Sequence, residues 1–358
     1  MTSSVNPYTG KPYSQTYKDI KKKWSKLPAQ SPKTVRAFNK LLDEKRLILL
    51  SASTGAGKST QIPKHILSYY TKKHPDRNPR VICTQPRKAA SRLLAERLVD
   101  ELDVELGTNV AYQYRGSESK HRGDKNTMLT FVTDGLLVNK LLGNNGKPGN
   151  IDCIMIDEAH ERSVNIDILL LLLKRIAHDP DLTTKVVIMS ATIQMDLFRE
   201  YMLDGLSDKD KSIVGEIDVE GRAYPVKSIW RKPPNGDNDY VDLVLEILDT
   251  TKEGDILIFL ATKNNIRDLS IYLKDAMQKG RHKNVQVHEL YSGLPKNVED
   301  KATKPDPNGQ RKVVLSTNIA ETSLTIHGVV YVIDSGKEIR KVYVPQYHAF
   351  EIKNSYIS

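Results

Sequence analysis

The amino-acid sequence predicts an α/β protein with two parallel-sheet domains in tandem. Short apolar runs alternate with helical stretches from residue 33 onward, and a second alternation of the same kind begins after residue 226. A glycine-bearing turn also joins the first apolar run to the first of these helices. Alternating β and α elements place helices on both faces of a parallel sheet. We therefore expect a first domain over residues 33–220 and a second over residues 226–358, joined by a hinge at 220–226.

The first 32 residues form a polar extension in this prediction. They are rich in Lys, Ser, Pro and Tyr and lack sustained periodicity, so we expect them to lie draped on the surface or to be disordered. The lysines of residues 18–26 are typical of a solvated helix face. No apolar leader and no run of eighteen apolar residues is present, which favours an intracellular protein without a membrane segment.

The two alternations place the individual elements. In the first domain, strands are expected at 47–50, 81–84, 128–132, 151–156 and 186–189, and helices around 60–70, 88–102, 134–142, 164–178 and 195–203. In the second domain, strands are expected at 256–259, 286–290, 313–316 and 329–333. Such runs are short and nearly continuous in apolar character, as in strands that are covered on both faces.

Charge and cysteine content narrow the function classes. Lys and Arg number 54 against 44 Asp and Glu, a net charge of +10, which favours a polyanionic partner. Cys83 and Cys153 both lie in apolar, strand-like runs. We therefore expect two buried thiols in a reducing compartment, and neither a disulfide nor a metal site.

The strongest local signal is the run LILLSASTGAGKSTQIP at residues 47–63. An apolar strand leads through a small, glycine-bearing turn into a helix, whose free N–H groups and positive dipole end face the turn. This pattern is a phosphate loop. In such a loop Lys58 reaches the β and γ phosphate oxygens and Ser59 ligates Mg²⁺. The predicted nucleotide-binding residues are Thr54, Gly55, Ala56, Gly57, Lys58, Ser59 and Thr60.

One position departs from the strict phosphate-loop pattern, because Ala52 stands where the first glycine is usual. Alanine is acceptable where the backbone φ is negative, so we expect little effect on the chemistry. The alternative interpretation is a glycine-rich loop before an ordinary helix. The agreement of strand, loop, Lys-Ser pair and apolar continuation favours the nucleotide site.

A phosphate loop needs an acidic strand to hold the metal and activate water, and residues 151–160 (IDCIMIDEAH) supply one. Ligands of open α/β sheets collect at the carboxyl ends of the strands, where this run places two carboxylates. Asp157 is expected to hold Mg²⁺ through its hydration shell, and Glu158 to orient and deprotonate the water that attacks the γ-phosphate of ATP. An isolated Asp-Glu pair would be a solvated turn, but together with the phosphate loop it predicts catalysis.

Seven blocks in order then resemble the motifs of the DEAH-box family of nucleic-acid helicases. The phosphate loop is the first, and the most specific is the run DEAHERS at 157–163. The others are TQPRK at 84–88, TDG at 133–135, SAT at 190–192, ILIFLAT at 256–262 and STNIAETSLTIHGVVYVIDSG at 316–336. The resemblance implies two RecA-like P-loop domains that use ATP and Mg²⁺ to move along single-stranded RNA.

The resemblance also implies roles for further residues. His160 would link the nucleotide to the facing domain, and Ser190 and Thr192 would couple hydrolysis to the grip on nucleic acid. Contacts to phosphate and 2′-OH groups of a single RNA strand would come from one surface, made of Arg87, Lys88, Thr133, Ser292 and Thr317. For each of these five, a helix cap or an ordinary surface charge is the alternative.

Residues 6–14 (NPYTGKPYS) resemble the N-terminal part of DEAH helicases that act in pre-mRNA splicing and ribosome maturation. This resemblance implies a nuclear protein that works in a spliceosomal or ribosome-assembly complex, with an activator protein as a possible partner.

The sequence departs from the family at its C-terminal side. The Arg-rich motif VI, which supplies arginine fingers, and the family's C-terminal domains do not appear before Ser358. We therefore expect the second domain to be incomplete at its C-terminus, with an unpaired sheet edge and marginal stability. The loop at 298–305 also lacks the aromatic residue often found there in relatives, which puts adenine stacking from that side in doubt.

Two functions remain open on the sequence. The first is an ATP-dependent RNA helicase, and the second is a helicase-derived module that binds nucleotide and RNA without useful turnover. Lys58, Asp157 and Glu158 favour the first, whereas the missing motif VI favours the second. A P-loop protein unrelated to nucleic acid is disfavoured by the blocks at 84–88, 133–135 and 316–336, which serve to grip a strand.

Overall fold

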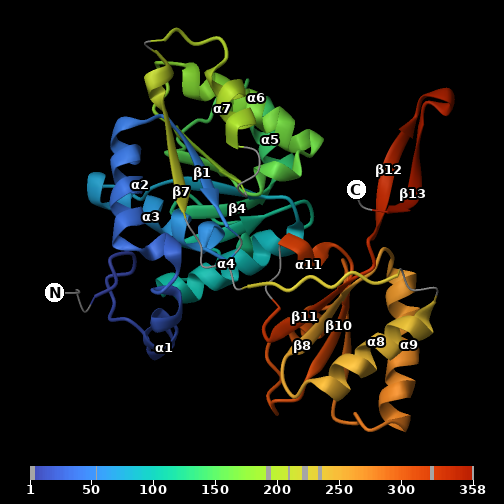
Figure 1. Ribbon diagram of the computed structural model, residues 1–358. Coiled ribbons are helices and arrows are strands. Elements are labelled where there is room, and N and C mark those ends of the chain that lie inside the picture. Colours follow the sequence, from blue (N-terminus) through green and yellow to red (C-terminus); the bar gives the residue numbers. More distant parts are fainter. Residues whose placement is uncertain are drawn as a thin grey trace. The chain divides into compact units, whose positions relative to one another are not determined.

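The first half of the chain is built on one seven-stranded parallel sheet in the computed structural model (Figure 1). The structure describes residues 5–53, 55–190, 195–208, 210–219, 225–232, 236–322 and 326–356. In the order β3-β4-β2-β5-β6-β1-β7, the strands are β3 (Val110–Gln113), β4 (Leu129–Thr133), β2 (Val81–Gln85), β5 (Cys153–Ile156), β6 (Lys185–Ser190), β1 (Leu47–Ala52) and β7 (Val214–Val219).

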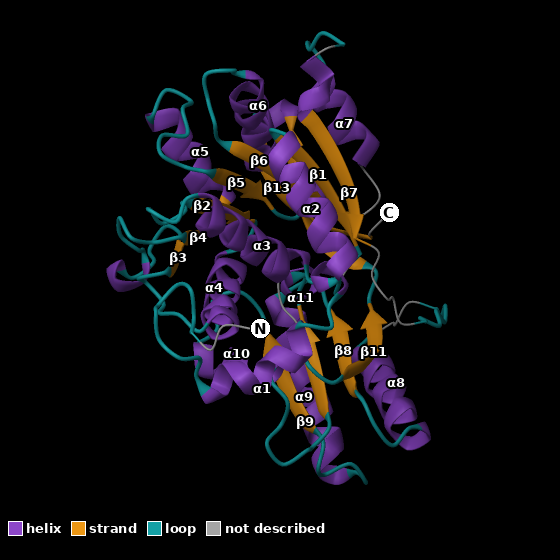
Figure 2. Ribbon diagram, turned by 90° about the vertical axis from the view of Figure 1, so that its left-hand side faces the viewer, coloured by secondary structure: helices purple, strands orange, loops and turns teal. Residues whose placement is uncertain are grey.

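Helices cover both faces of this sheet, and Figure 2 shows α2 and α3 lying across the strands on one of them. The helices α2 (Pro32–Glu44), α3 (Lys58–Lys73) and α4 (Lys88–Leu102) bury one face, with Phe38 and Leu42 of α2 fully inside. The helices α5 (Asp134–Gly143), α6 (Val164–His178) and α7 (Met195–Leu203) bury the other. Because both faces are covered, every residue of β1 is buried, which explains its unbroken apolar run.

Local sequence signals fix where several helices begin. Ser31 caps α2 by accepting a hydrogen bond from the Thr34 N–H, and Pro32 occupies the first helical position. Ser163 caps α6 in the same way through the Ile166 N–H. The sequence expectations had not included α2, although both of its start signals are visible in the sequence.

The N-terminal segment corrects one prediction. Residues 5–32 are not draped loosely on the surface, because they form α1 (Gln15–Trp24) and the short 3-10 helix η1 (Pro28–Gln30) against the first sheet domain. The Asn6 side chain is fully buried and donates hydrogen bonds to the carbonyl oxygens of Leu102 and Asp103, each at 2.8 Å. Ala29 is also fully buried within the core on the α3 side. Small and polar residues can thus join a core through backbone contacts that composition does not reveal.

The second half of the chain contains a four-stranded parallel sheet in the order β11-β8-β10-β9. Its strands are β8 (Asp255–Phe259), β9 (Gln286–Leu290), β10 (Lys312–Ser316) and β11 (Val329–Asp334). One face packs on α8 (Asp237–Thr250) and α9 (Lys263–Lys279). The helices α10 (Lys296–Thr303) and α11 (Ile319–Thr322) complete this part. On the edge strand β11, Val330 and Val332 are exposed.

An antiparallel hairpin follows, made of β12 (Lys337–Val344) and β13 (Ala349–Tyr356), and the sequence expectations did not include it. Short 3-10 helices lie at η2 (Ser119–His121), η3 (Ala159–Glu161), η5 (Asp210–Ile213) and η6 (Pro345–Tyr347). Contacts divide the chain into two units, residues 1–226 and 227–358, and we describe each by itself.

The predicted fold class of two α/β parallel-sheet domains is confirmed. All nine predicted strands are present, and β3 and β7 add to the five predicted for the first sheet. Cys83 and Cys153 are buried free thiols, as expected. No helix among the described residues is both long and apolar enough to span a membrane.

Candidate active site

The phosphate loop joins the end of β1 to the start of α3. Gly57 is the residue before the helix and has a φ of +90°, and Gly55 has a φ of +83°, so both need the conformational freedom of glycine. Gly57, in the capping position, has no side chain that could cap the start of α3. Because the first N–H groups of a helix lack intrahelical partners, this end of α3 can receive an anion.

Ala52 fits the departure noted in the sequence. It is the last residue of β1, fully buried, and lies opposite Val219 of β7. A strand conformation has a negative φ, which alanine adopts without strain. Thr54, one of the predicted nucleotide-binding residues, lies outside the described residues.

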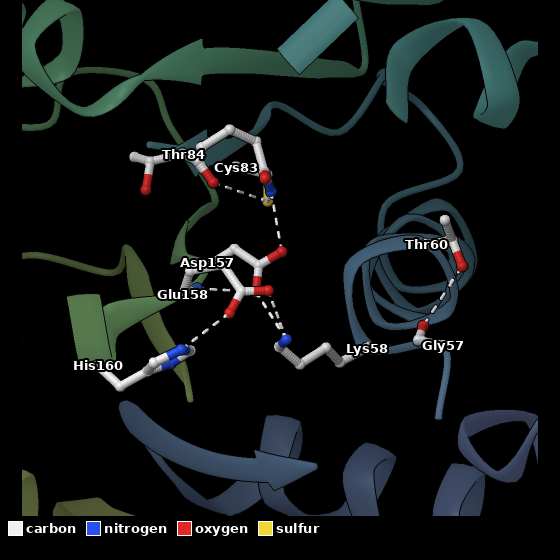
Figure 3. A network of polar contacts seen from close by, with 9 residues as sticks. Gly57, Lys58, Thr60, Cys83, Thr84, Asp157, Glu158 and His160 are labelled. Carbon is white, nitrogen blue, oxygen red and sulfur yellow. Dashed lines mark hydrogen bonds and ion pairs between the residues drawn. The ribbon is translucent and has the colours of Figure 1, made fainter. Parts of the chain in front are cut away.

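Lys58 turns from the start of α3 toward the end of β5, where two carboxylates meet it (Figure 3). Its Nζ lies 2.6 Å from Glu158 Oε1 and 3.9 Å from Asp157 Oδ1. Burial lowers the pKa of Lys58, but the two carboxylates outweigh burial and leave its pKa raised. The lysine is therefore charged at neutral pH, and the site holds a buried cation between a phosphate loop and two acids.

Asp157 is held in place by two hydrogen bonds. Its side chain is fully buried, its Oδ1 accepts the Glu158 N–H at 2.9 Å, and its Oδ2 accepts Gln85 Nε2 at 2.9 Å. The sequence prediction gave Gln85 no role of its own, although the residue lies in the run TQPRK at 84–88. A signal was present, because Gln85 ends β2 and β2 pairs directly with β5, which brings the two strand ends together.

Glu158 has an unusual backbone and an unusual environment. Its φ of +53° is uncommon for a residue with a Cβ, and such outliers cluster at functional sites. Burial, together with the neighbouring Asp157, raises the pKa of Glu158 to about 7. A carboxyl group with a pKa near neutrality is suited to accept a proton during catalysis.

His160 lies beside these acids, with Nε2 3.4 Å from Glu158 Oε2 (Figure 3). Burial, reinforced by the charge of Lys58, lowers the pKa of His160. The imidazole is thus neutral at pH 7 and contacts Glu158 as a polar neighbour, without forming an ion pair. Ser190 ends β6, is fully buried and pairs in register with Ser51 of β1, whereas Thr192 lies outside the described residues.

Three of the predicted RNA-contacting residues lie together at the carboxyl ends of strands in the first sheet. Arg87 precedes α4 just after β2, and its guanidinium lies 3.7 Å from Glu161 Oε1. Lys88 opens α4 and donates to the Arg115 carbonyl at 3.0 Å. Thr133 ends β4, the neighbour of β2. All three therefore lie at the carboxyl ends of adjacent strands.

The other two lie in the second unit. Ser292 follows β9 and is exposed, and Thr317 follows β10, where its N–H donates to the Leu290 carbonyl at 3.3 Å. Since β9 and β10 are neighbours, Ser292 and Thr317 also lie at the carboxyl ends of adjacent strands. That all five residues form a single surface stays a prediction.

The donor set fits a magnesium ion that is shared with a nucleotide. Within the described residues no three His, Cys, Asp or Glu side chains are grouped as a metal cage. Mg²⁺ typically binds through one or two carboxylates, waters and substrate phosphates, so Asp157 near the phosphate loop is a suitable partner. The buried hydroxyl of Ser53, in the loop itself, has no hydrogen-bond partner in the described part of the chain, and it is a free polar group for such a ligand.

Comparison with known proteins agrees with this geometry. Residues 31–199 match the family described as DEAD/DEAH box helicase, and residues 239–344 match the helicase conserved C-terminal domain. Together these two matches span more than half of the chain.

Individual relatives point the same way. The chain is 38% identical over 297 residues to a Caenorhabditis elegans protein named "Probable ATP-dependent RNA helicase DHX35 homolog". The aligned region covers 81% of this chain and 39% of that protein. It is 31% identical over 364 residues to the protein L540 of Acanthamoeba polyphaga mimivirus, covering 99% of this chain and 49% of that protein. The chain thus spans about two fifths to one half of these curated relatives.

A solved structure matches as well. The crystal structure of the Escherichia coli DEAH/RHA helicase HrpB superposes with a TM-score of 0.77 at 31% sequence identity, covering 93% of this chain and 40% of that one. The paired family matches, the shared fold and the run Asp157-Glu158-Ala159-His160 beside a phosphate loop lead to one assignment. The chain belongs to the DEAD/DEAH box helicase family.

Proposed function

We propose that this protein is an ATP-dependent RNA helicase that hydrolyses ATP with Mg²⁺ and uses the cycle to move along or remodel single-stranded RNA. One observation carries the proposal: Lys58 at the phosphate loop lies 2.6 Å from Glu158 and 3.9 Å from Asp157. A cation for phosphates and two acids for metal and water then occupy one site. The names of the relatives support ATP and RNA as its substrates.

The chain's own residues offer groups for the phosphates, the metal and the attacking water. The phosphates of ATP would compete with Glu158 for Lys58, and the released Glu158 would orient and deprotonate the attacking water. Ser59 and Asp157 would hold Mg²⁺, which supplies neutralisation of phosphate charge when bound. Catalysis of this kind needs positioning and electrostatic stabilisation, with no covalent intermediate on the protein.

The proposed RNA contacts come from the carboxyl ends of the strands in each of the two sheets. Arg87, Lys88 and Thr133 in the first unit, and Ser292 and Thr317 in the second, offer charges and hydroxyl groups to phosphate and 2′-OH groups. Such contacts hold a strand without reading its sequence. Nuclear location, an activator protein, and membership of a splicing or ribosome-assembly complex stay predictions from the N-terminal resemblance.

The test is ATP hydrolysis by the wild-type chain and the Glu158→Gln variant, with and without single-stranded RNA. Glutamine keeps the size of the side chain and can still accept a hydrogen bond from Lys58, but it cannot take a proton at neutral pH. We expect ATP affinity to be kept and the hydrolysis rate to fall by about 10²- to 10⁴-fold. The exposed Glu200 on α7 provides the control variant Glu200→Gln, for which we expect wild-type turnover.

Two results would contradict the proposal. Unchanged hydrolysis by Glu158→Gln would remove Glu158 as the base. Binding of nucleotide and RNA by the wild type without any hydrolysis would instead identify this chain as the inert binding module.

A further inference from the structure

The chain segment before α2 contacts the phosphate loop directly. We call residues 24–30, from Trp24 to Gln30, the brace. At its centre, the Ala29 N–H donates a hydrogen bond to the carbonyl oxygen of Ala56 in the loop, at 3.1 Å. Ala29 is fully buried, so this bond is shielded from water. A buried backbone hydrogen bond is costly to break without a replacement partner.

The other side of the same peptide is held by helix α3. His65 Nε2 lies 2.8 Å from the Ala29 carbonyl oxygen, and this contact is buried. Burial lowers the pKa of His65, so the ring is neutral at pH 7 and its Nε2–H donates to the carbonyl. The backbone at Ala29 is therefore fixed between the phosphate loop and the helix that follows the loop.

Leu27 packs on the glycine that ends the loop. A Cβ placed on Gly57 would lie 2.9 Å from Leu27 Cδ1 and 3.3 Å from Leu27 Cβ. The leucine thus covers the α-carbon of the residue whose φ of +90° turns the chain into α3. Because the space is already filled, Gly57 has little room to move in that direction.

Polar contacts fasten both ends of the brace to α3. The Lys64 Nζ lies 3.3 Å from the centre of the Trp24 ring and 2.8 Å from Glu101 Oε2. Gln30 Nε2 donates to Gln61 Oε1 at 2.7 Å. These contacts lie one to two helical turns beyond the loop, so the brace is anchored on the helix on which the loop depends.

We propose that the brace positions the phosphate loop, with Leu27 and Ala29 holding residues 56 and 57 in the conformation that receives the phosphates of a nucleotide. This inference rests on the proposed function, because it takes the loop to be a nucleotide site. A loop that is ordered before binding does not lose that conformational freedom on binding, and the ligand binds correspondingly tighter. The contacts of Leu27 and Ala29 described above go to the phosphate loop and to α3, so these residues act through the loop.

The test compares two leucines that occupy equivalent settings. Leu27 lies over Gly57, and Leu41 on α2 lies over Gly215 of β7, where a Cβ would lie 2.7 Å from Leu41 Cδ2. Both leucines are half-buried. Leu27→Ala and Leu41→Ala therefore remove similar apolar contacts from the same domain, but only the first removes them from the phosphate loop.

The measured quantity is the affinity for ADP in isothermal titration of the full chain. We expect Leu27→Ala to weaken ADP binding by about 5- to 30-fold, the cost of fixing the backbone of roughly one loop residue on binding, and Leu41→Ala to stay near the wild-type affinity. Leu27→Met, which refills the space, should restore most of the affinity. Equal affinities for the two alanine variants, with tight binding by the wild type, would overturn the inference. A wild type that binds no ADP would overturn the proposed function as well.

A second measurement uses the unmodified chain. Coupling between two sites is reciprocal, so a nucleotide that favours the braced loop must also stabilise the brace. Lys22 and Lys23, just before the brace, and Lys26, within it, are exposed and offer sites for trypsin. Saturating ADP should slow cleavage at these lysines severalfold, while cleavage at the exposed Lys252 after α8 stays unchanged. An unaltered rate at Lys22, Lys23 and Lys26 would contradict the coupling.

Discussion

Helices α3 and α9 start in the same topological place and differ in how they start. Each follows a strand in the interior of a parallel sheet, β1 for α3 and β8 for α9, and each has a lysine as its first residue, Lys58 and Lys263. At α9, the Thr262 side chain caps the helix by accepting the Asn265 N–H at 3.0 Å. At α3, Gly57 stands in the capping position and supplies no side chain.

The difference explains which end is open to a ligand. A hydroxyl cap uses one of the free N–H groups of a helix start and stabilises the helix by itself. A glycine leaves those groups to an anion and gives up that stabilisation in the free protein. The first unit therefore has an uncapped helix start at a place where the second has a helix start capped by a hydroxyl group.

The buried charged groups also differ between the two units, because those of the second unit are paired one to one and those of the first are not. In the second unit, Asp255 Oδ1 accepts the Lys312 N–H at 2.8 Å, and Lys312 Nζ lies 3.6 Å from Asp255 Oδ2, so the two residues satisfy each other within the sheet. In the first unit, Asp157 and Glu158 lie together after β5 and share one lysine. Two neighbouring buried carboxylates at a strand end cost stability, and they are useful only when a ligand brings compensating groups.

The largest effect expected from this comparison is that of Lys58→Ala. In the proposed site Lys58 would supply charged hydrogen bonds to two phosphates, and its loss would leave Asp157 and Glu158 to repel them. Charged hydrogen bonds contribute about 1.5–3 kcal/mol each, which corresponds to at least about a hundredfold loss in ATP affinity. Titration calorimetry with ATP measures it.

Lys263→Ala is the matched control, since Lys263 is the first residue of α9 and its Nζ lies 4.5 Å from the centre of the Tyr291 ring. We expect unchanged ATP affinity for this variant. If Lys58→Ala bound ATP like Lys263→Ala, the difference between the two helix starts would not concern nucleotide.

A smaller effect is expected from Asp134→Asn at the start of α5. Burial raises the pKa of Asp134 from its usual 3.8 to about 6. Between these values the folded protein keeps a proton that the unfolded chain has lost, so the contribution of Asp134 to stability falls as pH rises from 3.8 to about 6. An uncharged asparagine avoids this loss, and the variant should gain roughly 3 kcal/mol at pH 7.5.

Urea unfolding at several pH values measures the gain. The advantage of Asp134→Asn should shrink as pH falls below about 6 and should nearly vanish close to pH 4. The control is Asp196→Asn, an exposed acid in the first turn of α7, which should show no such trend. A gain that does not change with pH would refute the assignment to a buried charge.

The sequence predicted most of the first sheet because its inner strands are simple. The strands β1, β2, β5 and β6 are buried on both faces and therefore appear as continuous apolar runs. The strand β3 spans only four residues, and β7 mixes Gly, Glu and Asp with apolar residues, so neither gives such a run. Short or half-covered edge strands depend on their neighbours, which a local pattern does not contain.

The candidate site was predictable in part for the same reason. Lys58, Asp157 and Glu158 follow from motifs whose strand-end positions a parallel sheet brings together. The Gln85 contact to Asp157 depends on β2 lying beside β5, and the strand order is not written in any single motif. The brace was not predicted because its hydrogen bond to Ala56 comes from the backbone of Ala29, and a backbone contact leaves no pattern in the residue types.

The smallest effect expected is that of Thr262→Ala at the start of α9. Losing the hydroxyl leaves the Asn265 N–H without its cap, and such losses cost about 1 kcal/mol. We expect the urea midpoint of the second unit to fall accordingly, with ATP affinity unchanged because the phosphate loop lies in the first unit. Thr262→Ser keeps a hydroxyl and should retain most of the stability. A loss of ATP affinity of similar free energy in Thr262→Ala would show that the two helix starts are not independent. The cap of α9 in one unit would then have to support the nucleotide site in the other.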